Sequence, residues 1–120
     1  MDIEKLYEML RKVQEPKGYY FNNDKERTFE LLEGLLENKE RYGYMVCPCR
    51  LASGDREWDK DIICPCVYRE PDVEEYGSCY CNLYVSQEWN QGKILHAYVP
   101  ERRPPEKMRF WQSPDFVSAT

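Results

Sequence analysis

Apolar residues recur at helical spacing near the start of the chain. Within residues 2–14 they stand three or four positions apart and would share one side of a helix: Ile3, Leu6, Met9 or Leu10, and Val13. Pro16 and Gly18 follow directly, and both residue types interrupt helices. The pattern predicts a first amphipathic helix over residues 2–14.

A second and longer helical pattern covers residues 24–41. Its apolar face is formed by Phe29, Leu32, Leu35 and Leu36. The run Asn22-Asn23-Asp24 offers side-chain oxygens for an N-cap, and Gly43 suits the C-terminal cap. Gly34 weakens the helix only slightly. We therefore expect the best-defined helix of the chain here.

Shorter elements are predicted in the second half of the chain. Residues 55–63 favour a short helix that turns Trp58 and the pair Ile62-Ile63 inward. Residues 70–77 are acidic and contain Pro71, which indicates a loop with at most one helical turn.

Two short strands are predicted after this loop. They cover residues 83–85 and 94–99, which are rich in β-branched and aromatic side chains, and a turn at Asn90-Gln91-Gly92 separates them. The stretch from Pro100 to Thr120 is rich in proline and arginine and is expected to lie along the surface. The chain should be mainly helical, with short strands and loops.

Length and charge narrow the class of protein. A chain of 120 residues suits one domain over residues 1–120, with its core over about residues 24–100. The net charge of −5 argues against a general nucleic-acid binder, and no apolar run is long enough to span a membrane. The N-terminus is acidic and lacks the apolar stretch of a signal or transit peptide. We expect a cytoplasmic, prokaryotic protein that binds neither nucleic acid nor membrane.

Six cysteines form three Cys-x-Cys pairs: Cys47-Pro48-Cys49, Cys64-Pro65-Cys66 and Cys79-Tyr80-Cys81. In a cytoplasmic protein, such cysteines are more often metal ligands or redox groups than structural disulfides. A four-iron cluster takes four thiolates, which would leave two thiols for disulfide chemistry. Zinc sites and typical ferredoxin clusters favour Cys-x-x-Cys spacing, so the pattern favours a redox cluster over a zinc site with spare thiols or three disulfides. The spacing alone does not identify the four ligands.

The three cysteine pairs resemble those of the catalytic (beta) chain of ferredoxin:thioredoxin reductase. That family has two Cys-Pro-Cys elements followed by Cys-His-Cys, and the resemblance covers roughly residues 25–100. The spacers here are fourteen and twelve residues long, which differs from the family, and Tyr80 stands where the family has histidine. The resemblance implies a divergent member with the fold of this family, organised around an iron–sulfur cluster.

The resemblance also implies roles for the cysteines. A [4Fe-4S] cluster would be bound by Cys47, Cys64, Cys66 and Cys79. Cys49 and Cys81 would form the redox-active disulfide, with Cys49 as the attacking thiol and Cys81 on the cluster side. The implied activity is ferredoxin-dependent disulfide reduction in two one-electron steps. Arg50, next to Cys49, either favours the thiolate form of Cys49 or is a surface residue that pairs with a nearby acid.

Two residues are candidates for the proton chemistry. Tyr80 is a candidate catalytic residue, but a phenol is a poor base at neutral pH. His96 is the only histidine and could replace the family's imidazole, although lone histidines are more often packing or surface residues.

The resemblance implies ferredoxin as electron donor and a thioredoxin-like or glutaredoxin-like protein as acceptor, and a small variable subunit is a further candidate partner. Because ferredoxins are typically acidic, a basic stretch in the tail is a candidate docking face, although such stretches are often only solvated surface. Its basic residues are Arg102, Arg103, Lys107 and Arg109. The alternative function is a non-catalytic metal-binding or electron-transfer module, with iron–sulfur or zinc.

Overall fold

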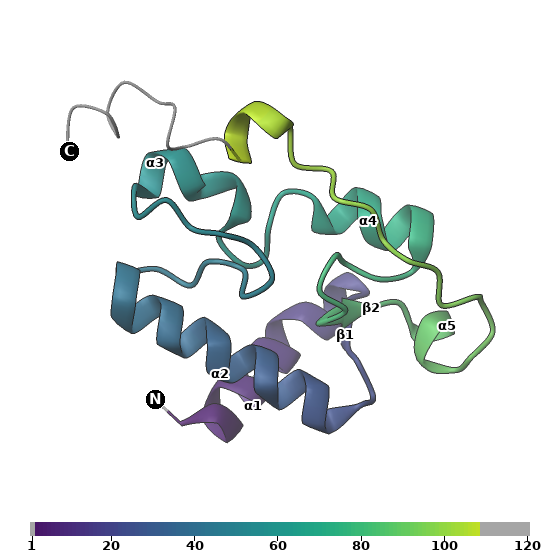
Figure 1. The fold of residues 1–120 in the computed structure, drawn as a ribbon. Coiled ribbons are helices and arrows are strands. Elements are labelled where there is room, and N and C mark those ends of the chain that lie inside the picture. The colour runs from purple at the N-terminus through teal and green to yellow at the C-terminus, as the bar shows by residue number, and fades with distance from the viewer. Residues whose placement is uncertain (1, 109–120) are drawn as a thin grey trace.

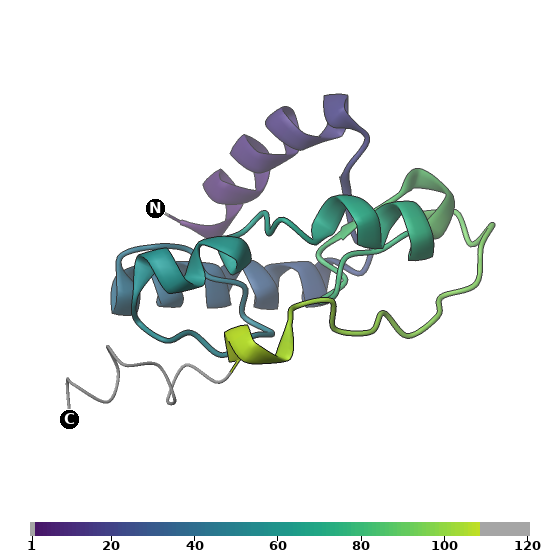
Figure 2. The same ribbon diagram turned by 90° about the horizontal axis from the view of Figure 1, so that it is seen from above.

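Two long helices make up most of the N-terminal half of the chain. The computed structural model describes residues 2–108, in which α1 spans Ile3–Gln14 and α2 spans Lys25–Tyr42. The two helices pack against each other on one side of the molecule, and later short helices lie on the other side (Figures 1 and 2). Both helices predicted over residues 2–14 and 24–41 are confirmed. On the predicted apolar face of α1, Ile3, Leu6 and Leu10 pack in or against the core, whereas Val13 is exposed.

The ends of these helices are capped as their sequences indicate. The side chain of Asp2 accepts a hydrogen bond from the backbone N–H of Lys5 at 2.7 Å. Asp24 accepts one from the N–H of Arg27 at 3.2 Å. Gly43 ends α2 with φ at 87°, a left-handed conformation that side chains with a Cβ rarely adopt.

Buried side chains from both helices and from the following loops form one apolar core. Its largest members are Leu6, Phe21, Leu31, Leu32, Leu35, Leu83 and Tyr84. Three cysteines, Cys47, Cys79 and Cys81, belong to the same core. Because burying one leucine side chain contributes about 1.5–3 kcal/mol, the leucines of α2 are a major support beneath the cysteine-bearing loops.

A two-stranded antiparallel sheet joins distant parts of the chain. Strand β1 (Tyr20–Phe21) pairs with β2 (Tyr84–Val85), so that Phe21 lies opposite Tyr84. The strand predicted over residues 83–85 is therefore present. Its partner is the segment between α1 and α2, which the periodicity did not indicate.

The second predicted strand, over residues 94–99, is wrong. Ser86 caps a helical turn, α5 (Gln87–Asn90), by accepting a hydrogen bond from the N–H of Trp89 at 3.1 Å. A helical turn therefore follows β2 where a hairpin was expected. His96 then stacks on Trp89 with ring centroids 3.6 Å apart, and the chain around it runs exposed without strand pairing.

Short helices occupy the segment between the first and third cysteine pairs. Helix α3 (Arg56–Asp59) and the 3₁₀ turn η2 (Lys60–Ile62) confirm the helix predicted over residues 55–63. Helix α4 (Arg69–Tyr76) runs for eight residues where mainly loop was expected. Pro71 is tolerated because it falls in the first turn, where backbone N–H groups lack intrahelical acceptors.

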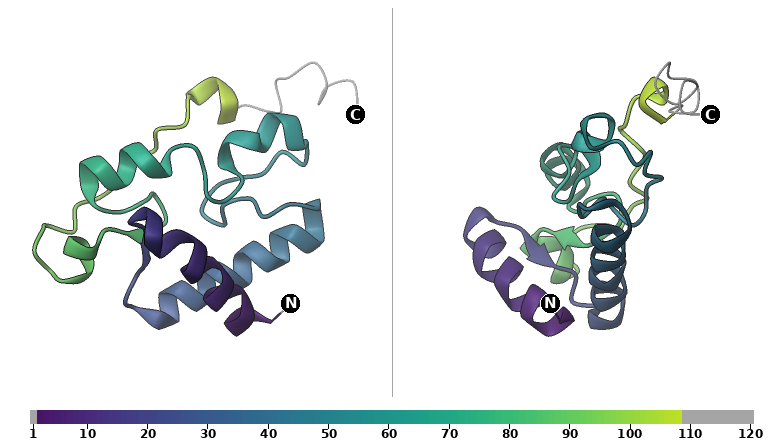
Figure 3. Two further views of the ribbon diagram at one scale, coloured as in Figure 1. Left: turned by 180° about the vertical axis from the view of Figure 1, so that it is seen from behind. Right: turned by 90° about the vertical axis from the view of Figure 1, so that its left-hand side faces the viewer.

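Residues 100–108, called here the C-terminal strap, run past α4 and end beside α3 in the 3₁₀ turn η3 (Pro105–Met108) (Figure 3). Arg103 in this strap is buried, with a side chain 2% exposed, and it donates a hydrogen bond to Asp61 at 2.9 Å. The indole N–H of Trp58 donates to the carbonyl of Lys107 at 2.8 Å. Most of residues 100–108 are exposed or half-buried, as expected of a surface stretch, and the exception is the buried Arg103.

The ion pairs of the strap also change the docking hypothesis. Arg102 pairs with Asp72 and Glu75 of α4, so both arginines of the strap meet acids within the molecule. Arg109 lies outside the described residues. The strap is thus a folded part of the domain and offers little free positive charge for an acidic partner. Over residues 2–108, no helix combines the length and apolar character needed to cross a membrane.

Candidate functional site

Backbone hydrogen bonds bring the three cysteine pairs together. The N–H of Cys47 donates to the carbonyl of Ile62 at 2.9 Å, and the N–H of Cys64 donates to the carbonyl of Met45 at 2.8 Å. These bonds tie the first pair to the second. The N–H of Cys79 donates to the carbonyl of Tyr84 at 2.9 Å, which ties the third pair to β2.

The first and third pairs form matching turns. The carbonyl of Cys47 accepts a hydrogen bond from the N–H of Arg50 at 3.1 Å, and the carbonyl of Cys79 accepts one from the N–H of Asn82 at 3.0 Å. Each turn therefore has one cysteine at its first position and the other at its third. Pro48 occupies the second position of the first turn, which its fixed φ suits.

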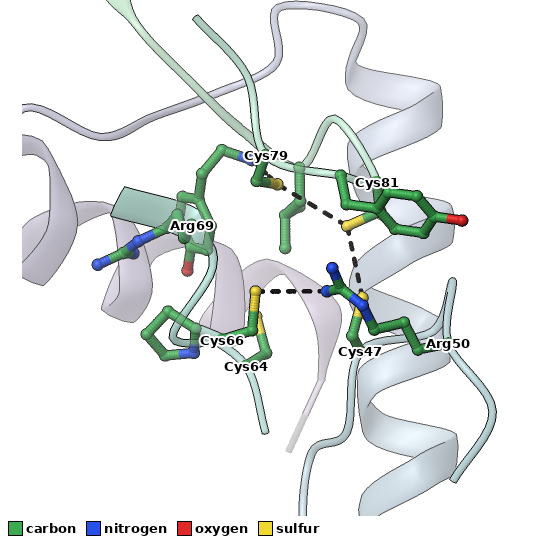
Figure 4. Close-up of a pocket in the computed structure, with 11 residues that line it drawn as sticks. Cys47, Arg50, Cys64, Cys66, Arg69, Cys79 and Cys81 are labelled. Carbon is green, nitrogen blue, oxygen red and sulfur yellow. Dashed lines mark hydrogen bonds between the residues drawn. The ribbon is translucent and has the colours of Figure 1, made fainter. Parts of the chain in front are cut away.

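Five of the six cysteines line one pocket (Figure 4): Cys47, Cys64, Cys66, Cys79 and Cys81. The sulfur of Cys81 lies 3.8 Å from that of Cys47 and 3.9 Å from that of Cys79. All six cysteines are free thiols in this structure. Within residues 2–108, no three side chains of Cys, His, Asp or Glu converge closely enough to hold a single metal ion. The sulfurs instead border the pocket from three loops.

Cys49 lies outside this pocket, in a neighbouring groove. The groove is also lined by Cys81, Arg27 and Tyr98. A guanidinium nitrogen of Arg27 lies 3.9 Å from the Cys49 sulfur. Hydrogen bonds from Cys47 and Cys81, aided by the charge of Arg27, hold the pKa of Cys49 well below its ordinary range. Cys49 is therefore a half-buried cysteine whose pKa is lowered, and Cys81 borders both pocket and groove.

Of the two expectations for Arg50, pairing with an acid is confirmed, by Glu101, although the side chain is buried and not at the surface. Its guanidinium donates to the Cys66 sulfur at 3.4 Å, and the cation beside Cys49 is Arg27. Glu101 of the C-terminal strap holds Arg50 through hydrogen bonds of 2.7 and 2.9 Å. The Arg50 side chain is 2% exposed. The strap therefore orients a buried cation against the wall of the cysteine pocket.

Among the deeper cysteines, hydrogen bonding to Cys81 lowers the pKa of Cys79, whereas the pKa values of the other four are raised. Burial raises the pKa of Cys64 well above its ordinary value, and burial also raises the pKa of Cys66. Hydrogen bonding to Cys47 raises the pKa of Cys81 as well. Cys64 and Cys66 would become thiolates only with a compensating positive charge, which is what metal ligation supplies.

The two candidates for proton chemistry lie in different places. Tyr80 lines both the pocket and the groove, and its ring lies 4.6 Å from the Arg50 guanidinium carbon. Burial raises the pKa of Tyr80, so the phenol stays protonated at neutral pH. His96 lines neither space, and its Nε2 lies 2.7 Å from the carbonyl oxygen of Trp89. The structure supports the packing interpretation of His96.

Sequence reasoning missed several residues of this site. Arg27 and Glu101 are far from the cysteines in sequence, and nothing local distinguishes them from surface charges. Gly34 could have been noticed in the sequence, since glycine is unfavourable inside a helix. The structure gives the reason for it: a Cβ at this position would lie 2.9 Å from the Cβ of Pro48. The sequence indicated Tyr84 only as a residue of a strand, yet its side chain lines the pocket.

Comparisons with known proteins agree with this arrangement. Residues 1–101 match the family model described as ferredoxin thioredoxin reductase catalytic beta chain. The chloroplastic ferredoxin-thioredoxin reductase catalytic chain of Arabidopsis thaliana is 34% identical over 95 residues, which is 71% of this chain and 60% of the relative. The corresponding chain of Synechocystis sp. is 32% identical over 71 residues, which is 58% of this chain and 57% of the relative.

The catalytic chain of Cyanidium caldarium is 28% identical over 90 residues, which is 70% of this chain and 74% of the relative. The chain spans about 60% of the length of the Arabidopsis and spinach relatives. The matched region contains all three cysteine pairs and the loops that bring them together. The chain therefore belongs to the ferredoxin thioredoxin reductase catalytic beta chain family.

Proposed function

We propose that this protein is a ferredoxin-dependent disulfide reductase. Its cofactor is a [4Fe-4S] cluster bound by four thiolates, those of Cys47, Cys64, Cys66 and Cys79. Its redox-active pair is Cys49 and Cys81. The family membership supports the reaction class, and the arrangement of the sulfurs supports the division of roles.

The residues of the pocket fit such a cluster. Thiolates are the usual ligands of iron–sulfur clusters, and all four proposed ligands line one pocket. Arg50 and Arg69 also line this pocket, and their positive charges favour an anionic cluster with its thiolates. The hydroxyl of Tyr84, in the same pocket wall, is buried without a hydrogen-bond partner among the described residues. Together these groups suit a bound group that accepts hydrogen bonds and carries negative charge.

The observation that carries the proposal is the placement of Cys49 and Cys81. Cys81 borders both the pocket and the groove, whereas Cys49 borders only the groove. A thiol that attacks a partner's disulfide must be accessible and ionised. Cys49 is half-buried and its pKa is lowered, whereas the pKa values of the other half-buried cysteines, Cys64 and Cys66, are raised. Cys81 is positioned to react with Cys49 on one side and to face the cofactor on the other.

The chemistry of the two cysteines follows from this placement. The Cys49 thiolate attacks one sulfur of the target disulfide, which forms a mixed disulfide and expels the other target sulfur as a thiolate. The sulfur of Cys81 then attacks Cys49, which releases the second target thiol and leaves a Cys49–Cys81 disulfide. When bound, the cluster supplies electrons one at a time from ferredoxin. Two electrons and two protons thus convert one target disulfide to two thiols.

The relatives' names support the choice of partners, ferredoxin as donor and thioredoxin as acceptor. For this divergent chain we propose a thioredoxin-like or glutaredoxin-like acceptor. The groove beside Cys49 would receive its disulfide, and the aromatic ring of Tyr98, 80% exposed, lies at this groove. A small variable subunit remains a further proposed partner.

The proposal is tested with anaerobically purified protein, reduced ferredoxin and an oxidised thioredoxin-like protein. Thiol formation on the acceptor should be catalytic with the wild type and absent with Cys49→Ser. Cys81→Ser should instead accumulate a stable mixed disulfide through Cys49, because the resolving thiol is missing. A colourless protein with stoichiometric zinc, or a Cys49→Ser variant that still reduces the acceptor, would exclude this function.

A further inference from the structure

Tyr84 is fixed between the apolar core and the cysteine pocket. It is 2% exposed, and its ring stacks on that of Phe21, its partner across the sheet, with centroids 5.3 Å apart. The guanidinium carbon of Arg69 lies 4.9 Å from the centre of the same ring. The ring is therefore held by neighbours on several sides and has little freedom to turn its hydroxyl elsewhere.

The backbone of Tyr84 forms hydrogen bonds with Cys79, one of the proposed cluster ligands. Its N–H donates to the Cys79 sulfur at 3.3 Å, and its carbonyl accepts from the N–H of Cys79 at 2.9 Å. Both bonds fix Tyr84 relative to the third cysteine pair. The side chain that lines the pocket is thus attached to the loop that would hold the cofactor.

The hydroxyl of Tyr84 lacks a hydrogen-bond partner among residues 2–108. Other tyrosines of this protein are satisfied: the hydroxyls of Tyr44 and Tyr68 donate to Asp59 and Asp61, each at 2.7 Å. A buried hydroxyl is rarely left unpaired, because it has lost its bonds to water. Tyr84 lines the same pocket as Cys64, Cys79 and Cys81, so its unpaired hydroxyl lies in a pocket wall that it shares with cysteines.

We propose that the Tyr84 hydroxyl donates a hydrogen bond to a sulfur atom of the cluster bound in this pocket. The inference rests on the proposed function, since the acceptor is the cofactor itself. Hydrogen bonds to cluster sulfurs favour the electron-rich reduced state and so raise the reduction potential. Tyr84 would then tune the ease with which the cofactor accepts an electron.

Tyr84→Phe tests this inference, because it removes only the hydroxyl oxygen and keeps the ring packing. The variant should keep its iron and acid-labile sulfide, but its midpoint potential in a spectroelectrochemical titration should become more negative. We expect about a tenfold change in the reduction equilibrium, which corresponds to 59 mV for a one-electron couple. Tyr44→Phe is the matched control, since it removes a buried hydroxyl that donates to Asp59, and its potential should equal that of the wild type.

A second variant covers the case in which Tyr84→Phe fails to fold. Site-specific replacement of Tyr84 by 3-fluorotyrosine keeps the hydroxyl and makes it a stronger donor, so the potential should rise. An unchanged potential in a cluster-loaded Tyr84→Phe or fluorotyrosine protein would overturn the inference while leaving the proposed function intact. An equal shift in Tyr44→Phe would also overturn it. A wild type without iron and sulfide would remove both the proposed function and this inference.

Discussion

At the scale of single residues, the site depends on short distances between segments of the chain, which cannot be predicted from the residue types alone. Gly34 is the clearest case, because it lets α2 contact the first cysteine turn. A Cβ at this position would lie 2.9 Å from the Cβ and 3.1 Å from the Cγ of Pro48. Contacts this short force one of the two segments to move, and neither a helix backbone nor a proline ring yields easily.

Gly34→Ala is therefore expected to destabilise the protein, although alanine is the better helix former by about 1 kcal/mol. Overpacking of this kind costs about 1–3 kcal/mol, and the displaced turn carries the proposed ligand Cys47, so iron retention should fall as well. Chemical denaturation and iron analysis measure the two effects. Glu37→Ala, at an exposed position of the same helix, controls for propensity and should change neither. A Gly34→Ala protein more stable than the wild type would show that the approach is looser than described.

At the scale of elements, the C-terminal strap links the acidic helices to the cysteine pocket. Arg103 pairs with Asp61, which also accepts a hydrogen bond from Tyr68, and Glu101 orients Arg50. Burial alone would raise the pKa of Asp61, but the bonds from Arg103 and Tyr68 outweigh it and hold the pKa below its ordinary value.

Asp61→Asn should lower the free energy of unfolding by about 3 kcal/mol at pH 7, because Arg103 stays buried and loses its closest partner. The second carboxylate, Asp59, lies 3.8 Å from Arg103 and still neutralises part of its charge. The expected loss in the free energy of unfolding is therefore at the low end of the range for breaking a buried ion pair. Because the folded pKa of Asp61 lies below the unfolded value of about 3.9, its contribution is present above that pH and is lost as the pH falls through the folded pKa. The gap between wild type and variant, measured by urea unfolding, should be equal at pH 7 and pH 5. A gap that halves between these two pH values would contradict this assignment.

At the scale of the whole molecule, local signals were predictable and distant pairings were not. The helices α1 and α2 follow from apolar spacing and from caps at Asp24 and Gly43, all of which lie within a few residues of each helix. The pairing of β1 with β2 and the burial of Arg103 depend on segments far apart in sequence, which hydrophobic periodicity cannot match.

In the candidate site too, local features could be predicted from the sequence and contacts between distant segments could not. The three cysteine pairs favour a redox or metal site, whereas the proposed reaction and the roles of the individual cysteines come from the family resemblance. The cation beside Cys49 could not be read from the sequence, since adjacency pointed to Arg50 and the fold brings Arg27 of α2 instead. The donor Tyr84 was equally hidden, because a tyrosine in a strand is explained by strand propensity alone.

The division of the six sulfurs into ligands and a redox pair is tested most directly by the iron and acid-labile sulfide content of six single Cys→Ser variants, purified without oxygen. We predict loss of the cluster in the four ligand variants, which replace Cys47, Cys64, Cys66 and Cys79. Cys49→Ser and Cys81→Ser should retain the cluster, because these two thiols are assigned to disulfide chemistry. Equal loss of iron in all six variants, or loss in Cys49→Ser with retention in Cys64→Ser, would contradict the division of the sulfurs into ligands and a redox pair.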